Sequence, residues 1–192
     1  MKNKSRLFLV PALTLCLSAA DEPKKYDYRV LSTSKTSTME KEMNEAAAAG
    51  YSFAGAMGGE SAVGSKEVIV VMAKGPEAPA ANKRYKLLAT SKTSTMQKEL
   101  QAAGNEGFDY RGQTVFESAF GGQEVCVILE HDPQSAAGRI EYRLLATTKT
   151  STMQKELQQA GDAGFQFLGV LVGKTAFGGK EVISLLKLVP KQ

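Results

Sequence analysis

The pattern of apolar and polar residues repeats three times along the chain without an insertion. Tyr28, Tyr85 and Tyr142 lie 57 residues apart, and each opens a nearly identical segment. The three segments read YRVLSTSKTSTMEKEM, YKLLATSKTSTMQKEL and YRLLATTKTSTMQKEL. Similarity at a fixed period is the sequence signature of a repeat protein, so the chain consists of three tandem modules.

Each module begins with a short strand and continues into a helix. Residues 142–147, for example, are rich in strand-favouring side chains. Apolar residues such as Met39 and Met43 then recur at helical spacing and predict one buried stripe. The segment Ser-Thr-Met-Glu/Gln matches a capping box, in which the serine and the Glu or Gln side chains bind free backbone N–H groups. We therefore expect three capping serines, namely Ser37, Ser94 and Ser151.

A glycine ends each predicted helix, and two strands follow it. Gly50, Gly107 and Gly164 are suited to the left-handed position after a helix, and each precedes an aromatic residue that can fold back on the last turn. The last strand is a nearly continuous apolar run, typical of coverage on both faces. These runs are residues 68–72, 125–129 and 182–186, and the hairpin turns before them fall at 64–65, 121–122 and 178–179.

These elements predict an α+β fold of three tandem βαββ modules, each a three-stranded sheet with one helix packed on one face. We place the modules at residues 26–75, 83–132 and 140–189, joined by Pro-, Ala- and Ser-rich linkers. Modules of this size are near the limit for an independent hydrophobic core, roughly 40 to 60 residues. We therefore expect the three copies to pack on one another.

The N-terminus has the pattern of a signal peptide over residues 1–20. Three basic residues precede a short apolar run, and small residues at 18–20 form a cleavage site. The run is shorter than the ~20 residues that span a bilayer. We expect cleavage near Ala20 and a periplasmic or secreted protein without a transmembrane segment. The alternative is a lipid anchor at Cys16, although Leu15 fits a lipoprotein box poorly.

Export changes the interpretation of the charge. The formal net charge is +4, but three of the 24 basic residues belong to the leader, which leaves 21 basic and 20 acidic side chains. No basic run remains, and so we expect no nucleic-acid binding. Cys126 is the single cysteine after cleavage, so the exported chain has no internal disulfide.

Three segments of each module carry a family resemblance. They are the opening Tyr-Lys/Arg-Val/Leu-Leu strand, a Leu-x-x-x-Gly-x-x-Gly-aromatic segment and a Gly-rich hairpin. The middle segment comprises Leu100, Gly104, Gly107 and Phe108 in the second copy and Leu157, Gly161, Gly164 and Phe165 in the third. Together they resemble a short bacterial βαββ domain of unknown function. The first copy departs from it at Met43 and Ala47, and Tyr or Phe replaces the usual tryptophan. The resemblance implies the fold and no activity.

The chain offers few side chains for catalysis. His131 is the only histidine, and Cys126 aligns with Ile69 and Ile183 in the most apolar strand. Nucleophilic triads and zinc sites of ordinary composition need further partners. We therefore expect no catalytic residue, no metal site and no cofactor, with His131 on the surface and Cys126 a buried small hydrophobe.

Repeated carboxylates are the remaining catalytic option. They recur in the helices at Glu42, Glu99 and Glu156 and before the last strands at Glu67, Glu124 and Glu181. Paired carboxylates can supply an acid and a base. However, a glutamate early in a helix is favoured by the helix dipole, and one beside a hairpin is commonly solvated. We favour this structural interpretation.

The most repeated polar motif lies at the helix starts. Free N–H groups there, with hydroxyls and a lysine beside them, form a natural site for phosphate, sulfate or a sugar carboxylate. The candidate ligand-binding residues are Lys35, Thr36, Ser37, Thr38, Lys92, Thr93, Ser94, Thr95, Lys149, Thr150, Ser151 and Thr152. Helix capping and the core account for part of the same motif.

The sequence thus predicts an exported, non-enzymatic repeat protein of the bacterial envelope or exterior. Its modules would bind a protein or an anionic small-molecule or glycan ligand, and three sites would add avidity. The alternative is a carboxylate-dependent hydrolase acting on envelope material at a cleft between modules. A pocket that gathers glutamates from different copies would favour the hydrolase.

Overall fold

The computed structural model describes residues 24–60, 66–76, 82–90, 92–117, 123–135, 138–174 and 180–188. The predicted leader, the lipid-anchor alternative at Cys16 and the predicted hairpin turns lie outside these residues. Within the described residues, the structure contains no helix with the length and apolar character that crossing a membrane requires.

The described chain forms three antiparallel sheets of three strands, and one helix follows the first strand of each sheet. The elements are β1 Asp27–Thr33, α1 Thr36–Ala48, β2 Ser52–Glu60 and β3 Lys66–Lys74; β4 Arg84–Thr90, α2 Thr93–Asn105, β5 Asp109–Glu117 and β6 Gln123–His131; and β7 Glu141–Thr147, α3 Thr150–Asp162, β8 Gln166–Lys174 and β9 Lys180–Leu188. The strand orders are β1-β3-β2 in sheet 1, β4-β6-β5 in sheet 2 and β7-β9-β8 in sheet 3. This confirms a mixed α+β chain of three βαββ-like units.

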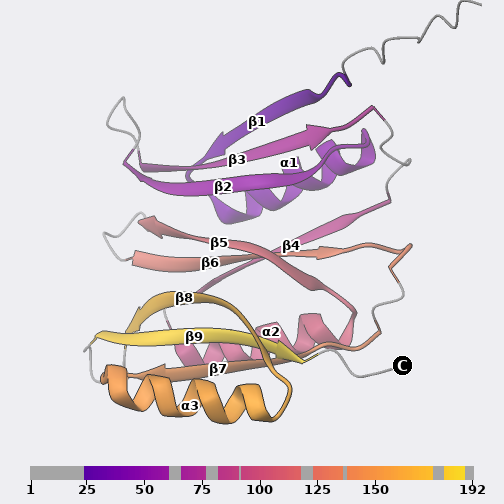
Figure 1. Cartoon of the computed structure of the whole chain (residues 1–192). Coiled ribbons are helices and arrows are strands. Elements are labelled where there is room, and N and C mark those ends of the chain that lie inside the picture. The colour runs from indigo at the N-terminus through magenta and orange to yellow at the C-terminus, as the bar shows by residue number, and fades with distance from the viewer. Residues whose placement is uncertain are drawn as a thin grey trace, which may run out of the picture.

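The three modules follow one another along the molecule, with sheet 1 at one end and α3 at the other (Figure 1). Each of α1 and α2 packs on its own sheet and on the sheet of the next module, so two cores are shared between modules. The first core joins Leu31, Met39, Met43, Ala46, Ala47, Tyr51, Val68, Val70 and Met72 to Tyr85, Leu87, Cys126 and Ile128 of the second module. The second joins Leu88, Met96, Leu100, Ala103, Phe108, Val125, Val127 and Leu129 to Ile140, Tyr142, Leu171, Ile183 and Leu185 of the third. The expectation that the copies pack together is confirmed.

The last strand of each module is central in its sheet, which explains its apolar run. β6 is buried at every position from Val125 to Glu130, because α1 covers one face of sheet 2 and α2 the other. In β3 only alternate residues are buried, namely Val68, Val70 and Met72. The prediction of two covered faces therefore holds in β6, whereas the outer face of sheet 1 has no helix on it among the described residues.

The helix ends follow the prediction closely. Gly50, Gly107 and Gly164 have positive φ angles of 90°, 82° and 90°. After α1, the N–H of Gly50 donates to Ala47 and that of Tyr51 to Ala46, which is the Schellman arrangement. The aromatic residues that follow the glycines are buried, as expected.

The helix starts differ from the prediction. Each helix begins one residue before the expected serine, with Lys35, Lys92 and Lys149 as the N-cap residues, and no side chain caps these helices. The capping-box prediction for Ser37, Ser94 and Ser151 is therefore wrong, because these serines lie within the first turn. Threonine hydroxyls hold the preceding bend instead: the Oγ1 atoms of Thr33, Thr90 and Thr147 accept from the lysine N–H groups at 3.2 Å.

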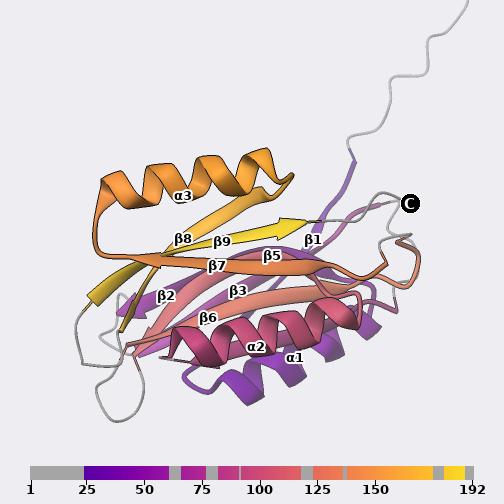
Figure 2. The ribbon, with the colours of Figure 1, turned by 90° about the horizontal axis from the view of Figure 1, so that it is seen from below.

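The third module is rotated relative to the other two. Figure 2 shows α3 on the opposite side of the sheets from α1 and α2. α2 nevertheless contacts sheet 3 closely, since a Cβ added to Gly104 would lie 2.3 Å from the carbonyl oxygen of Ile140 and 2.9 Å from the Tyr142 ring. The equivalent Gly161 of α3 has open space at that point.

This difference predicts opposite effects of one substitution at two equivalent glycines. Gly104→Ala should lower the free energy of unfolding by roughly 1–3 kcal/mol, because the added methyl group overpacks the interface. Gly161→Ala should raise it by about 0.5–1 kcal/mol through helix propensity alone. Urea unfolding followed by circular dichroism measures both, and equal effects at the two sites would contradict the packing described here.

Candidate functional site

Two polar positions on each of α1 and α2 bind the edge strand of the next module. In the first interface, the N–H of Leu87 donates to Glu40 Oε2 at 2.8 Å. Asn44 binds both backbone groups of Tyr85, accepting from its N–H at 2.9 Å and donating to its carbonyl at 3.0 Å. β4 is an edge strand with outward backbone groups that need partners. The helix of the preceding module therefore caps this edge.

The second interface repeats this arrangement. The N–H of Leu144 donates to Gln97 Oε1 at 2.7 Å, and the N–H of Tyr142 donates to Gln101 Oε1 at 3.1 Å. Gln97 Nε2 also donates to the Tyr142 carbonyl at 2.8 Å. Glu40 and Gln97, which the sequence motif assigns to capping, thus bind the neighbouring module, and equivalent backbone groups are bound in both interfaces.

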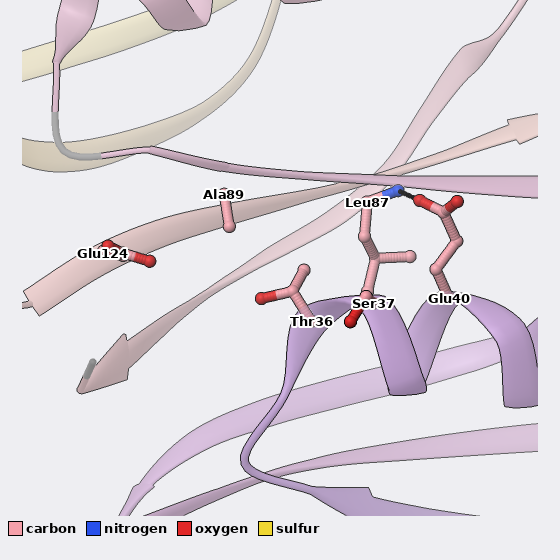
Figure 3. A pocket seen from close by; sticks show the side chains of 6 residues that line it. All are labelled: Thr36, Ser37, Glu40, Leu87, Ala89 and Glu124. Atoms are coloured by element: carbon pink, nitrogen blue, oxygen red, sulfur yellow. Dashed lines mark hydrogen bonds between the residues drawn. The ribbon is translucent and has the colours of Figure 1, made fainter. Parts of the chain in front are cut away.

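A cleft of ≈ 480 Å³ opens where α1 meets sheet 2 (Figure 3). It is lined by Thr36, Ser37, Glu40, Leu87, Ala89 and Glu124. Its hydroxyls and one carboxylate come from α1, and the second carboxylate comes from the second module. The volume lies within the range of small-molecule sites, roughly 300–1,000 Å³. The cleft therefore combines part of the predicted helix-start motif with carboxylates from two copies.

The three predicted helix-start sites have different surroundings. Thr36 and Ser37 line the cleft at the start of α1, where Lys35 is exposed and Thr38 half-buried. At the start of α2, Thr93 Oγ1 donates to Glu181 Oε1 of the third module at 2.5 Å. An anion bound there would compete with this carboxylate. Of the remaining motif residues of α2 and α3, Thr95 is half-buried. The others are exposed, namely Lys92, Ser94, Lys149, Thr150, Ser151 and Thr152.

The repeated glutamates other than Glu124 and Glu181 differ in their surroundings. Glu67 accepts a hydrogen bond from the Ser32 hydroxyl within sheet 1. In the helices, Glu42 and Glu156 are half-buried and Glu99 is exposed. Among the described residues, no three His, Cys, Asp or Glu side chains are grouped as metal ligands would be.

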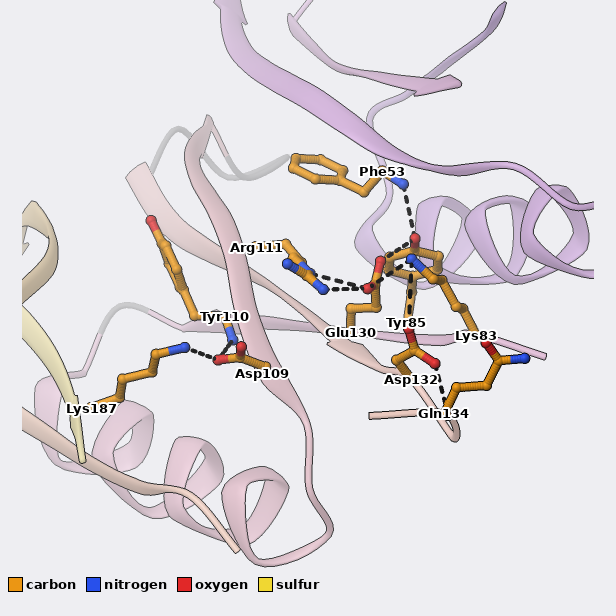
Figure 4. A network of polar contacts seen from close by, with 10 residues as sticks. All are labelled: Phe53, Lys83, Tyr85, Asp109, Tyr110, Arg111, Glu130, Asp132, Gln134 and Lys187. Atoms are coloured by element: carbon orange, nitrogen blue, oxygen red, sulfur yellow. Dashed lines mark hydrogen bonds and ion pairs between the residues drawn. The ribbon is translucent and has the colours of Figure 1, made fainter. Parts of the chain in front are cut away.

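A buried ion network lies beside the first interface (Figure 4). The Glu130 side chain accepts from the Tyr85 hydroxyl at 2.5 Å and from Arg111 at 2.7 Å, and Lys83 lies 3.2 Å away. Burial and the hydrogen bond to Glu130 raise the pKa of Tyr85, so the phenol stays protonated and donates. The same hydroxyl accepts from the N–H of Phe53, which links the network to module 1.

The repeat pattern of the sequence does not predict this network. Position 130 is Glu only in the second module, whereas the first has Ala73 and the third Lys187. Lys187 forms its own ion pair with Asp109 at 2.6 Å, across the second interface. The only sign of the network in the sequence is therefore that the three copies carry different residues at this equivalent position.

The two remaining reactive side chains are not among the residues that line the cleft. Cys126 is fully buried in the first core, and burial raises the pKa of its thiol to about 12. The thiol is therefore protonated and a poor nucleophile at neutral pH. His131 is half-buried rather than fully on the surface, and its ring lies 5.5 Å from that of Phe108.

Comparison with known proteins finds no matching family model, no matching curated protein and no matching solved structure. The resemblance to a bacterial βαββ domain therefore remains an expectation from the sequence.

The capping of edge strands by helix side chains predicts unequal effects of two identical substitutions. Gln97→Ala should lower the free energy of unfolding by about 1–3 kcal/mol, because it leaves partly buried backbone groups of β7 without partners. Gln154→Ala, at the equivalent exposed position of α3, should change it by no more than ~0.5 kcal/mol. Urea unfolding of both variants tests this, and a loss at Gln154 as large as that at Gln97 would refute it.

Proposed function

We propose that this chain is an exported, non-enzymatic scaffold protein of the bacterial envelope or exterior that binds a ligand between its modules. The observation that carries the proposal is the use of the repeated polar side chains. Glu40, Asn44, Gln97 and Gln101 bind backbone groups of the next module, so the repeat serves to build a continuous stack. In such stacks, binding surfaces lie along and between the modules.

The cleft of the first interface is the proposed ligand site. The carboxylates of Glu40 and Glu124 accept hydrogen bonds, and the Thr36 and Ser37 hydroxyls both donate and accept. This chemistry suits the hydroxyl groups of a glycan. The N-terminus of α1 and the exposed Lys35 add positive potential beside the cleft, which favours a glycan that carries a carboxylate.

Binding of a uronic-acid oligosaccharide tests this site. Calorimetry should show one site per chain, and Lys35→Ala should weaken binding by about two- to fivefold, the usual effect of one charge at a helix terminus. Lys149→Ala is the matched control, because Lys149 occupies the same position before α3, on which no further sheet packs in the part of the chain that the structure describes. Phosphate, sulfated glycans and the neutral oligosaccharide serve as comparison ligands.

The glycan proposal fails if none of these ligands binds. It also fails if Lys35→Ala, Lys149→Ala and the triple variant at Lys35, Lys92 and Lys149 all bind as the wild type does.

A second function, carboxylate-dependent hydrolysis, has one observation in its favour. The lining of the cleft includes two carboxylates from different modules, Glu40 and Glu124, and paired carboxylates can supply an acid and a base. Against it, Glu40 already accepts a backbone hydrogen bond from the second module. Release of reducing ends from the bound oligosaccharide, abolished by Glu124→Gln, would favour the hydrolase over the scaffold.

Export is tested by expressing the full chain in a bacterial host. We expect it in the periplasmic or secreted fraction, with an N-terminus at or near Asp21 by intact mass and N-terminal sequencing. A chain that keeps Met1 and stays in the cytoplasm would contradict export. Membrane-bound protein with a lipid on Cys16 would support the lipid-anchor alternative.

A further inference from the structure

The two ends of the stack expose apolar side chains. Among the described residues, all but one of the exposed large hydrophobic side chains belong to the end modules. Tyr26, Tyr28, Val30 and Met57 lie in or beside sheet 1, and Phe167, Val170 and Val172 lie on β8. Repeat proteins normally cover their ends with modules that have a polar outer face. The apolar ends of this chain therefore either bind a partner or lower the solubility of the protein.

The outer face of sheet 1 is equivalent to the face that sheet 2 packs against α1 and that sheet 3 packs against α2. Tyr28 is 63% exposed, whereas the equivalent Tyr85 and Tyr142 are 3% and 2% exposed. Val30 is 65% exposed, whereas the equivalent Leu87 is 8% exposed. β1 pairs with β3 in the same register as β4 with β6, so its outer edge presents the same backbone groups.

At the other end, α3 exposes the face that α1 and α2 pack against a following sheet. Gln154 and Gln158 occupy the positions of Gln97 and Gln101, and both are exposed. Met153 and Leu157 are only half-buried, whereas Met39 and Met43 of α1 are fully buried. Open space at Gly161 would accept the close approach that Gly104 makes to the next strand.

We propose that these two ends bind each other in different molecules, so that α3 of one copy packs on sheet 1 of the next. Gln158 would bind the backbone of Tyr28, and Gln154 would accept from the N–H of Val30. Both internal interfaces already realise these hydrogen bonds in the same chain. A second copy is therefore the occupant whose complementarity the structure itself contains, and the inference does not depend on ligand binding.

Such an interface joins two different surfaces and leaves both outer ends free. Association is then heterologous and proceeds to open chains rather than to a closed dimer. The resulting filament would continue the row of modules from one molecule into the next.

Two variants block one end each without touching the core. Val30→Glu places a charge on the exposed face of sheet 1, and Gly161→Lys places a long side chain in the open space on α3. Lysine is used because α1 carries Ala47 at this position, so a methyl group is compatible with one internal interface. Circular dichroism and urea unfolding verify the folds, and Tyr28→Lys with Gln154→Lys forms a second pair if either variant fails to fold.

Sedimentation velocity over a wide range of concentration gives the result. The wild type is purified from the fraction that contains it and is kept free of ligand. The average mass of its sedimenting species should increase with protein concentration. Each variant alone should associate at least about tenfold more weakly than the wild type, since one buried charge opposes the interface. The mixture of the two should form a one-to-one pair, because each variant keeps the end that the other lacks.

Three results would overturn the inference. The first is a wild type that stays monomeric at every concentration. The second is a Gly161→Lys variant that associates as strongly as the wild type, which indicates a symmetric contact between sheet 1 faces. The third is a mixture that behaves as the sum of its two variants.

Discussion

The outer backbone edge of the first strand in the second and third modules needs hydrogen-bond partners, and the helix of the preceding module supplies them. This constraint explains why two helix positions keep side chains that can accept from a backbone N–H, Glu or Gln at one and Asn or Gln at the other. An unpaired edge strand would otherwise attract other strands. The same bonds fix each sheet at a defined position on the preceding helix, so that the shared cores can form.

The effects of this constraint are visible wherever equivalent positions differ. Met39 and Met43 are fully buried only because sheet 2 covers the side of α1 that its own sheet leaves open. The third core is small, with Ala160, Phe165 and Leu186 as its buried members, since no further sheet packs on α3 among the described residues. The cleft beside Thr36 also arises from this packing, because its lining combines α1 with the first and last strands of sheet 2.

Much of the fold could be predicted from the sequence because its signals are local. The apolar stripe of each helix and the glycine after it depend only on residues of one module. The period of 57 residues shows that the same module occurs three times. The capping-box prediction failed because Glu40 and Gln97 have partners 47 residues away, in the next module. A local motif contains no information about such a partner. Likewise, the motif at the helix starts is repeated three times, but the following module makes each start different: Glu124 lines the cleft beside α1, and Glu181 binds Thr93 of α2.

Native-state hydrogen exchange of three equivalent amides tests the central claim directly. The N–H groups of Leu87 and Leu144 bind helix side chains of the preceding module, whereas the equivalent N–H of Val30 belongs to the exposed end strand. At concentrations where the chain is monomeric, the Leu87 and Leu144 amides should be protected and the Val30 amide should exchange rapidly. Equal protection of all three amides, or rapid exchange at Leu87 and Leu144, would contradict the account.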